Sequence, residues 1–161
     1  MASQMHKGKN MTTCKITIVD QISEDLDKHW TADSIAYETS HGVNFNHSKV
    51  SFVISNEDNE SCGVLIATTV FAEIYVENLW VDSAHRGQGY GRKLLQSLEN
   101  RFKGQGFNNI NLFTSAFQAP EFYIKCGYTA EFTRVNHNNP RLTKTFFVKY
   151  FDEEHQTQGL L

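Results

Sequence analysis

A glycine-rich loop between a β-rich segment and an amphipathic helix constrains the fold of this chain most strongly. Residues Arg86–Gly91 read RGQGYG and follow the β-branched and aromatic stretch 71–81. Glycine permits positive φ and close backbone approach, so successive amides of such a loop can point into one concavity, to which the next helix adds the positive end of its dipole. The loop therefore favours a strand–loop–helix unit that binds phosphate, although a tight turn without a ligand would use the same glycines.

Apolar periodicity indicates the helix that follows this loop. Its apolar residues recur at helical spacing while polar residues fill the other face. These apolar positions are Tyr90, Leu94, Leu95, Leu98 and Phe102. Gly104 and Gly106 are expected to end the helix.

Alternating apolar residues and turn residues predict the remaining elements. Strands are expected at 16–19, 50–54, 62–70, 71–81, 110–113, 128–135 and 143–151. Ser23 is a candidate N-cap for one or two helices in the acidic stretch that follows, and 120–126 fits a short helix with a proline in its first turn. This order predicts an α/β fold with a mixed sheet.

Length and charge exclude several classes of protein. The 161 residues fit one domain of 18.4 kDa, which we expect at 14–152 between flexible ends at 1–13 and 153–161. No apolar run approaches the ~18 to 20 residues of a membrane span. The 15 Lys and Arg against 18 Asp and Glu give a net charge of -3 without basic blocks. We therefore expect neither a membrane nor a nucleic acid as partner.

The cysteines and histidines point to a cytoplasmic protein without a metal. Cys14, Cys62 and Cys126 have no C-x-x-C spacing and cannot all pair, which is typical of a reducing compartment. The N-terminus lacks the apolar segment of a signal peptide. None of the seven histidines forms a His-x-x-x-His or H-x-E pattern, so no metal site is predicted.

The loop can be tested against known phosphate-binding motifs by its spacing. The dinucleotide pattern G-x-G-x-x-G fails because Arg92 or Leu94 stands where the third glycine is required, and the Gly-Lys-Ser/Thr of Walker A is absent. The R/Q-x-x-G-x-G/A signature of the GNAT superfamily of acyl-CoA-dependent N-acetyltransferases matches at Arg86, Gly89 and Gly91. Two longer stretches, LWVDSAHRGQGYGRKLL and FQAPEFYIKCGY, also resemble elements of that family.

The resemblance covers about 15–151 and implies the fold and the donor. It implies a single GNAT-like domain with a mixed, mostly antiparallel sheet of about six to seven strands, flanked by helices and splayed between two central parallel strands, with acetyl-CoA in the opening. Backbone amides of the loop would hold the pyrophosphate, strand backbone would pair with pantetheine, and the Arg86 guanidinium would remain solvated. The implied cofactor-binding residues are Leu79, Trp80, Val81, Arg86, Gly87, Gln88, Gly89, Tyr90, Gly91 and Arg92.

A base is required because an amine with pKa ~10.4 is mostly protonated at neutral pH. Presenting it as the free, deprotonated nucleophile costs about 4.6 kcal/mol. Strand alternation would place Glu73, Tyr75, Glu77 and Leu79 on one face. The resemblance favours Glu77 as the base, with Glu73 behind it. The ordinary alternative is a solvated or paired strand carboxylate.

Tyr123 matches the tyrosine of the family's F-Y-x-x-x-G element, which implies that it protonates the departing thiolate. The alternative is a core aromatic residue. Ala116 replaces an asparagine that many relatives have seven residues before this tyrosine, and Gln118 is a candidate substitute. Cys126 fits a buried structural thiol better than a nucleophile, which favours direct transfer.

The acceptor is less well constrained by the sequence. In this family it binds between the first helices and the last interstrand loop, here about 23–47 and 136–141. The acidic bias of 23–47 would favour a cationic amine, although such a charge run is more often a solvated helix face. We therefore expect acetyl transfer to a primary amine of a small molecule. A protein or peptide N-acetyltransferase and a non-catalytic acyl-CoA-binding module are the alternatives, and the family also allows a homodimer.

Overall fold

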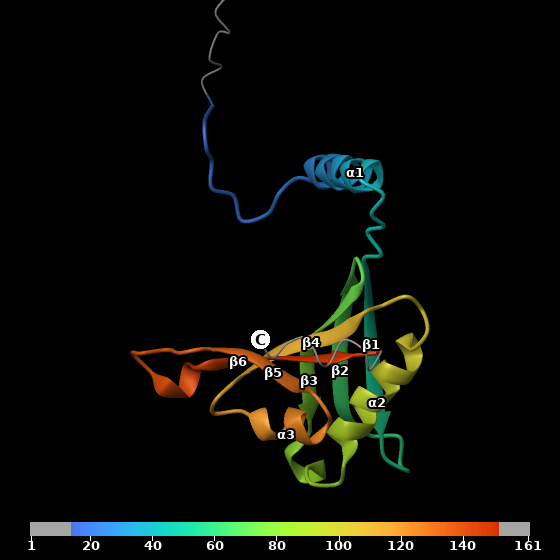
Figure 1. The fold of residues 1–161 in the computed structure, drawn as a ribbon, viewed down its shortest axis with the longest axis vertical. Coiled ribbons are helices and arrows are strands. Elements are labelled where there is room, and N and C mark those ends of the chain that lie inside the picture. Colours follow the sequence, from blue (N-terminus) through green and yellow to red (C-terminus); the bar gives the residue numbers. More distant parts are fainter. Residues whose placement is uncertain (1–13, 152–161) are drawn as a thin grey trace, which may run out of the picture.

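The computed structural model describes residues 14–151, and the predicted flexible ends at 1–13 and 153–161 lie outside them (Figure 1). The elements in chain order are α1 (Glu24–Ser40), β1 (Ser48–Ser55), β2 (Ser61–Val70), β3 (Glu73–Val81), the 3₁₀ turn η1 (Ser83–His85), α2 (Tyr90–Phe102), β4 (Asn109–Ser115), α3 (Pro120–Lys125), β5 (Thr129–Arg134), the 3₁₀ turn η2 (Pro140–Leu142) and β6 (Lys144–Tyr150). No helix among these residues is both long and apolar enough to cross a membrane.

The described strands form one six-stranded sheet in the order β1-β2-β3-β4-β6-β5. Neighbouring strands are antiparallel except for the central pair, β3 and β4, which are parallel and joined by the crossover through α2. These two strands pair only where Glu73–Tyr75 lies beside Asn109–Asn111, and beyond that point they no longer form a ladder. The predicted mixed sheet, splayed between two parallel strands, is confirmed.

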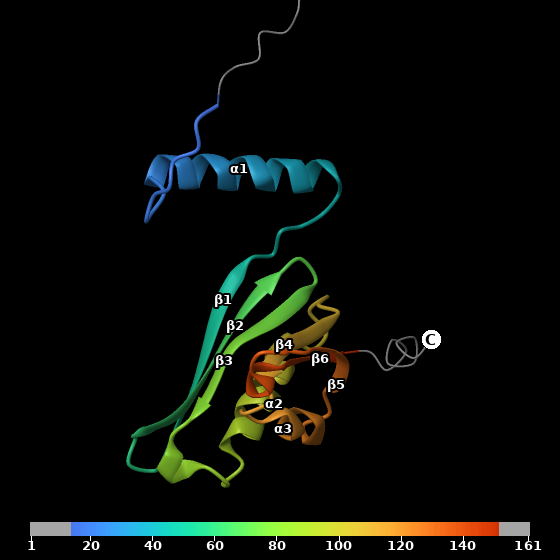
Figure 2. The ribbon, with the colours of Figure 1, turned by 90° about the vertical axis from the view of Figure 1, so that its left-hand side faces the viewer.

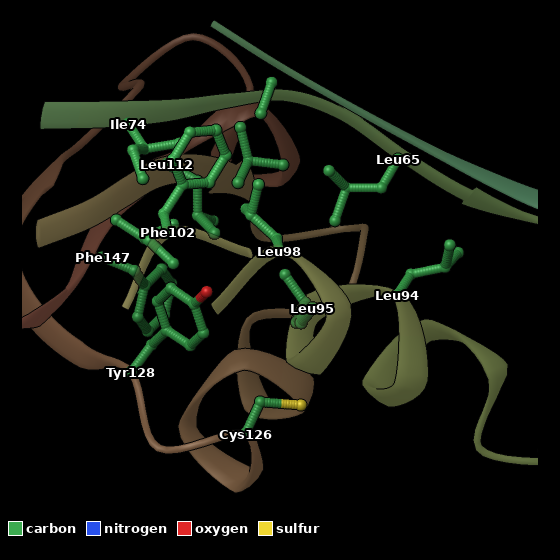
Figure 3. Packing of buried hydrophobic residues seen from close by; sticks show 13 residues of the cluster. Leu65, Ile74, Leu94, Leu95, Leu98, Phe102, Leu112, Cys126, Tyr128 and Phe147 are labelled. Carbon is green, nitrogen blue, oxygen red and sulfur yellow. The ribbon is translucent and has the colours of Figure 1, made fainter. Parts of the chain in front are cut away.

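The core lies between α2 and the sheet, as the helical periodicity predicted (Figure 3). Leu94, Leu95, Leu98 and Phe102 form the buried face of α2, which packs on β1, β2 and β3. The largest fully buried side chains of the sheet are Leu65, Ile74, Ile110 and Phe147. This packing fixes where α2 begins, and with it the loop that precedes it.

A β-bulge in β3 changes which side chains share a face. Consecutive residues of β2 lie opposite Val76 and Asn78, so Glu77 between them has no ladder partner. Because an extra residue shifts the alternation by one, Leu79 lies opposite Leu65 and packs against the core. The prediction that Leu79 shares the face of Glu77 is therefore wrong.

The N-terminal part of the described chain departs most from the prediction. Residues 14–19 form no strand, and Ile16 and Ile18 are 95% and 96% exposed. β-branched residues favour a pleated, half-buried surface, and here no sheet edge lies beside them. Ser23 does cap α1, accepting a hydrogen bond from the Leu26 amide at 3.3 Å, but α1 has no buried residue and lies apart from the sheet (Figure 2).

The other predicted elements form with small shifts at their ends. The predicted strand 71–81 begins at Glu73, because Phe71 has φ 55° in a turn and donates its amide hydrogen bond to the Phe45 carbonyl at 2.8 Å. That contact holds the segment between α1 and β1 against the β2–β3 turn. Beyond it, α1 is directed away from the sheet (Figure 2).

Candidate active site

A cavity of about 800 Å³ lies where β3 and β4 separate. It is lined by the bulged half of β3, the glycine loop, the first residues of α2, the end of β4 and α3. The residues that the sequence singled out and that line it are Glu77, Leu79, Trp80, Val81, Arg86, Gly87, Gly89, Tyr90, Gly91, Arg92, Gln118 and Tyr123. Gln88 is not among the lining residues. Segments up to 46 residues apart thus meet in one concave site.

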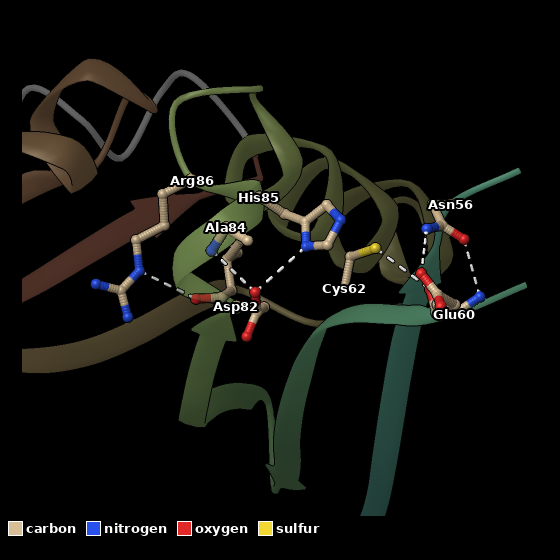
Figure 4. Close-up of polar contacts among 8 residues, drawn as sticks. Asn56, Glu60, Cys62, Asp82, Ala84, His85 and Arg86 are labelled. Carbon is tan, nitrogen blue, oxygen red and sulfur yellow. Dashed lines mark hydrogen bonds and ion pairs between the residues drawn. The ribbon is translucent and has the colours of Figure 1, made fainter. Parts of the chain in front are cut away.

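The turn before the glycine loop is fixed by Asp82 (Figure 4). Its Oδ1 accepts a hydrogen bond from the Ala84 amide at 2.9 Å and lies 3.3 Å from Nδ1 of His85. These contacts lower the pKa of Asp82, the Ala84 amide most, so the carboxylate is charged at neutral pH. Nε of Arg86 donates to the Val81 carbonyl at 3.1 Å, so this guanidinium is tied to the end of β3. Arg86 is exposed, as expected, and this hydrogen bond anchors its exposed side chain.

The loop itself has the backbone conformation that its glycines allow. Gly87 and Gly89 have φ of 77° and 80°, which side-chain-bearing residues rarely adopt. Gly89 is the N-cap of α2 and supplies no side-chain cap. The first amides of α2 therefore have neither an intrahelical acceptor nor a side-chain acceptor, and they belong to residues that line the cavity.

Two further side chains of the cavity, His85 and Lys125, were not predicted from the sequence. His85 lines it beside Arg86, and its ring stacks on Tyr90 with 6.2 Å between centroids. Lys125 lines it from the end of α3, where its carbonyl accepts a hydrogen bond from Arg92 at 2.8 Å. The family signature covers only the arginine and glycine positions, so it does not identify His85 or Lys125 as site residues.

Glu77 projects from the bulge and is held by two residues of neighbouring strands. Nζ of Lys49 lies 2.8 Å from its Oε2, and the hydroxyl of Thr68 donates to its Oε1. The hydrogen bond from Lys49, followed by that from Thr68, lowers the pKa of Glu77. The side chain is 28% exposed. Glu77 is therefore a carboxylate, not a carboxylic acid, at neutral pH.

Tyr123 lines the same cavity from α3. Its ring contacts those of Phe122, Tyr128 and Phe147, with centroids 5.1 to 6.1 Å apart. Burial raises the pKa of Tyr123 to about 12. The phenol therefore keeps its proton at neutral pH and can donate it to a stronger base that forms in the cavity.

The fold agrees with that of known acetyltransferases. A family model described as an acetyltransferase (GNAT) domain matches residues 48–130, just over half of the chain. The chain belongs to the GNAT acetyltransferase family. It is therefore an acyltransferase.

The chain is similar to a curated acetyltransferase and to several solved acetyltransferase structures. It is 36% identical over 73 residues to blasticidin-S acetyltransferase of Streptomyces morookaense, a match that covers 45% of this chain and 54% of that enzyme. The structure of an acetyltransferase from Bacillus cereus is 30% identical, with a TM-score of 0.66 over 83% of this chain and 97% of that one. An aminoglycoside 6'-N-acetyltransferase complexed with coenzyme A shares the fold at 18% identity, with a TM-score of 0.56 over 79% and 87%.

Gln118 and Cys126 lie near Tyr123 in the sequence, and the structure shows what surrounds each of them. Gln118 lines the cavity near the position of Ala116, but its Oε1 already accepts hydrogen bonds from the Thr114 hydroxyl and the Ser115 amide, at 3.1 and 2.9 Å. Cys126 is buried and does not line the cavity, and burial raises its thiol pKa. Both observations disfavour a thiolate nucleophile.

The predicted acceptor segments do not line this cavity. No residue of 23–47 or 136–141 is among its lining residues, and α1 lies apart from the sheet (Figure 2). The second segment does reach the cavity wall, because the Arg141 carbonyl accepts a hydrogen bond from the amide of the lining residue Phe117 at 3.3 Å. Within 14–151, no three His, Cys, Asp or Glu side chains gather in a way that could hold a metal ion.

Proposed function

We propose that this GNAT acyltransferase moves the acetyl group of acetyl-CoA directly to a primary amine of a small molecule. The observation that carries the proposal is that Glu77, from β3, and Tyr123, from α3, line one cavity, next to a loop with unsatisfied amides. One residue holds a charged carboxylate and the other a protonated phenol. Acyl transfer from a thioester to an amine needs both.

The donor end of the cavity suits an anionic cofactor. The net charge of -3 offers no general attraction to acetyl-CoA, so its binding must come from local groups. Arg86, Arg92, His85 and Lys125 supply positive charge or hydrogen-bond donors around the loop. The amides of Gln88 through Arg92 would hold the pyrophosphate. The backbone of Leu79–Val81, which has no partner in β4, would pair with the pantetheine amides.

The proposed step balances with these two side chains. The amine nitrogen attacks the thioester carbonyl carbon, and its proton goes to Glu77, directly or through water. The C–S bond breaks, and the thiolate takes the phenolic proton of Tyr123. Solvent then returns a proton to Tyr123 and removes one from Glu77. The products are the N-acetyl amine and the free thiol, without an acyl-enzyme intermediate.

Glu77 and Tyr123 are proposed to act at opposite ends of this step, and single substitutions separate their contributions. Glu77→Gln and Tyr123→Phe are each expected to lower kcat about 10²-fold or more, since proton transfer in the transition state is lost. Acetyl-CoA should still raise the melting temperature of both variants. Glu57→Gln, in the β1–β2 turn, and Tyr37→Phe, on α1, are matched controls with unchanged turnover.

A panel of small primary amines and lysine peptides, with detection of the released thiol, tests the acceptor. Turnover of peptides alone would overturn the small-molecule proposal. Acetyl-CoA binding without turnover of any amine, or activity that is unchanged in both variants, would instead favour a non-catalytic acyl-CoA-binding protein.

A further inference from the structure

A second cavity, of about 260 Å³, lies on the sheet beside the paired ends of β3 and β4. Glu73, Tyr75 and Asn111 line it, and they alternate with the core residues Ile74 and Ile110. These three side chains therefore point to the face opposite α2. Residues of β5 and β6 complete the walls, among them Glu131 and Phe146.

The carboxylate of Glu73 is held in a fixed position in this cavity. Its Oε1 accepts a hydrogen bond from the side-chain amide of Asn109, and its Oε2 accepts one from Asn111, each at 3.1 Å. Asn111 also donates to Oδ1 of Asn109 at 2.9 Å, and Asn109 is only 4% exposed. Amides orient the carboxylate without cancelling its charge. Glu73 is thus an exposed side chain whose carboxylate is held in place by two amides.

A second carboxylate lines the same cavity. Glu131 is the extra residue of a bulge in β5, because Ala130 lies opposite Phe147 and Phe132 opposite Phe146. Among residues 14–151, no lysine, arginine or histidine forms an ion pair with Glu73 or Glu131.

Two cations of β5 and β6 are engaged with aromatic rings. The Arg134 guanidinium lies 4.9 Å from the centroid of Phe146, and Nζ of Lys144 lies 4.2 Å from that of Phe113. Two negative charges in an aromatic-walled cavity without a paired cation fit a cationic ligand.

The second cavity adjoins the proposed reaction centre. Tyr75, in its wall, is two residues before Glu77, and its ring centroid lies 6.4 Å from that of Phe113, which lines the main cavity. Leu112 lines both cavities. At the rise of an extended strand, Glu73 and Glu77 are roughly 13 Å apart along β3. A molecule with one amine near Glu77 could place a second ammonium group near Glu73.

We propose that this cavity is a subsite for a second ammonium group, so that the acceptors of this enzyme are dicationic amines. The inference rests on the acyl transfer proposed above and names its substrate class. One ammonium group lies between Glu73 and Glu131 beside the Tyr75 ring, and the other loses its proton and attacks the thioester.

Two linear acceptors of equal length, 1,8-diaminooctane and 8-amino-1-octanol, test the subsite, since only the first carries the second charge. With the full chain and saturating acetyl-CoA, kcat/KM is expected to be about tenfold higher for the diamine, as for a hydrogen bond to a charged group. Glu73→Gln and Glu131→Gln should each reduce this ratio toward one, and Glu131→Gln should change kcat/KM for the amino alcohol little. Equal kcat/KM for the two acceptors, or a ratio unchanged in both variants, would overturn the proposal.

Calorimetric titration of the diamine separates this inference from the transfer reaction. Wild type should bind it about tenfold more tightly than Glu73→Gln, whereas Glu57→Gln should match wild type. If the diamine binds in this way but no amine is turned over, the transfer reaction is refuted and the subsite is supported. No saturable binding, or equal binding by Glu73→Gln, would refute the subsite. Melting curves confirm that each variant is folded, and Glu131→Gln leaves the Asn109–Asn111 contacts intact.

Discussion

Nζ of Lys49 lies 2.8 Å from Oε2 of Glu77, so the proposed base is already paired with a cation from the first strand of the sheet. Such a pair keeps the carboxylate charged at neutral pH but also makes it a weaker base. Lys49 thus sets the lower end of the pH range in which Glu77 can accept a proton.

Replacing Lys49 by methionine should shift the pH dependence of activity. The Lys49 hydrogen bond is the largest cause of the lowered Glu77 pKa, so its loss raises that pKa toward the ordinary value. The acid limb of kcat/KM, below which Glu77 is protonated, should move to higher pH. Profiles from pH 4 to 8 measure the shift, with Lys28→Met on α1 as the control. An unmoved acid limb would show that Glu77 does not limit the rate.

Tyr123 should make the protein less stable in alkali. Its folded pKa of about 12 lies above the unfolded value of ~10, so the contribution of the protonated phenol is complete below pH ~10 and is lost as the pH rises toward 12. The full effect is on the order of 2 to 3 kcal/mol. Urea unfolding at pH 8, 10 and 11 should show a smaller loss in Tyr123→Phe than in wild type. Parallel losses in the two proteins would contradict the assignment.

Tyr128 offers a stabilising substitution. The side chain is 3% exposed, and its buried hydroxyl has no hydrogen-bond partner (Figure 3). An unsatisfied buried hydroxyl costs about 1 to 3 kcal/mol. Tyr128→Phe should therefore raise the melting temperature by roughly 2 to 4 °C for each kcal/mol recovered. A lower melting temperature would mean that the hydroxyl makes a favourable contact.

Gly89 and Gly42 form a matched pair for testing donor binding. Both have positive φ, of 80° and 72°, and a Cβ at either would meet no atom within 4 Å. Alanine at each position should cost a similar ~1 to 2 kcal/mol of backbone strain. Saturating acetyl-CoA, at ~100 times its Kd, should raise the melting temperature of wild type and Gly42→Ala by roughly 5 to 10 °C.

Only Gly89→Ala should lose most of this shift, because its loop amides are redirected. An equal shift in the two variants would exclude the loop as the pyrophosphate site.

Local sequence patterns predicted most of the elements that form the proposed donor site. The strand–loop–helix unit, the buried face of α2 and the position of Tyr123 on a short helix all depend on residues within a few positions of each other, and their periodicity is visible in the chain. The strand expected at 16–19 was wrong because a strand also needs a neighbouring edge. A sequence pattern cannot show whether such an edge is present.

The acceptor side depended on contacts between distant residues. Strand alternation predicted that Leu79 and Glu77 share one face of β3. A bulge in the pairing of β3 with β2 places them on different faces. The pairing of Glu77 with Lys49 spans 28 residues, and that of Glu73 with Asn111 spans 38.

The sequence alone predicted the family, the loop proposed to bind the donor and the kinds of side chain proposed for the reaction. The tertiary structure decided which carboxylates face which cavity and with what partners, because strand register and cross-strand hydrogen bonds are fixed only when the whole sheet assembles.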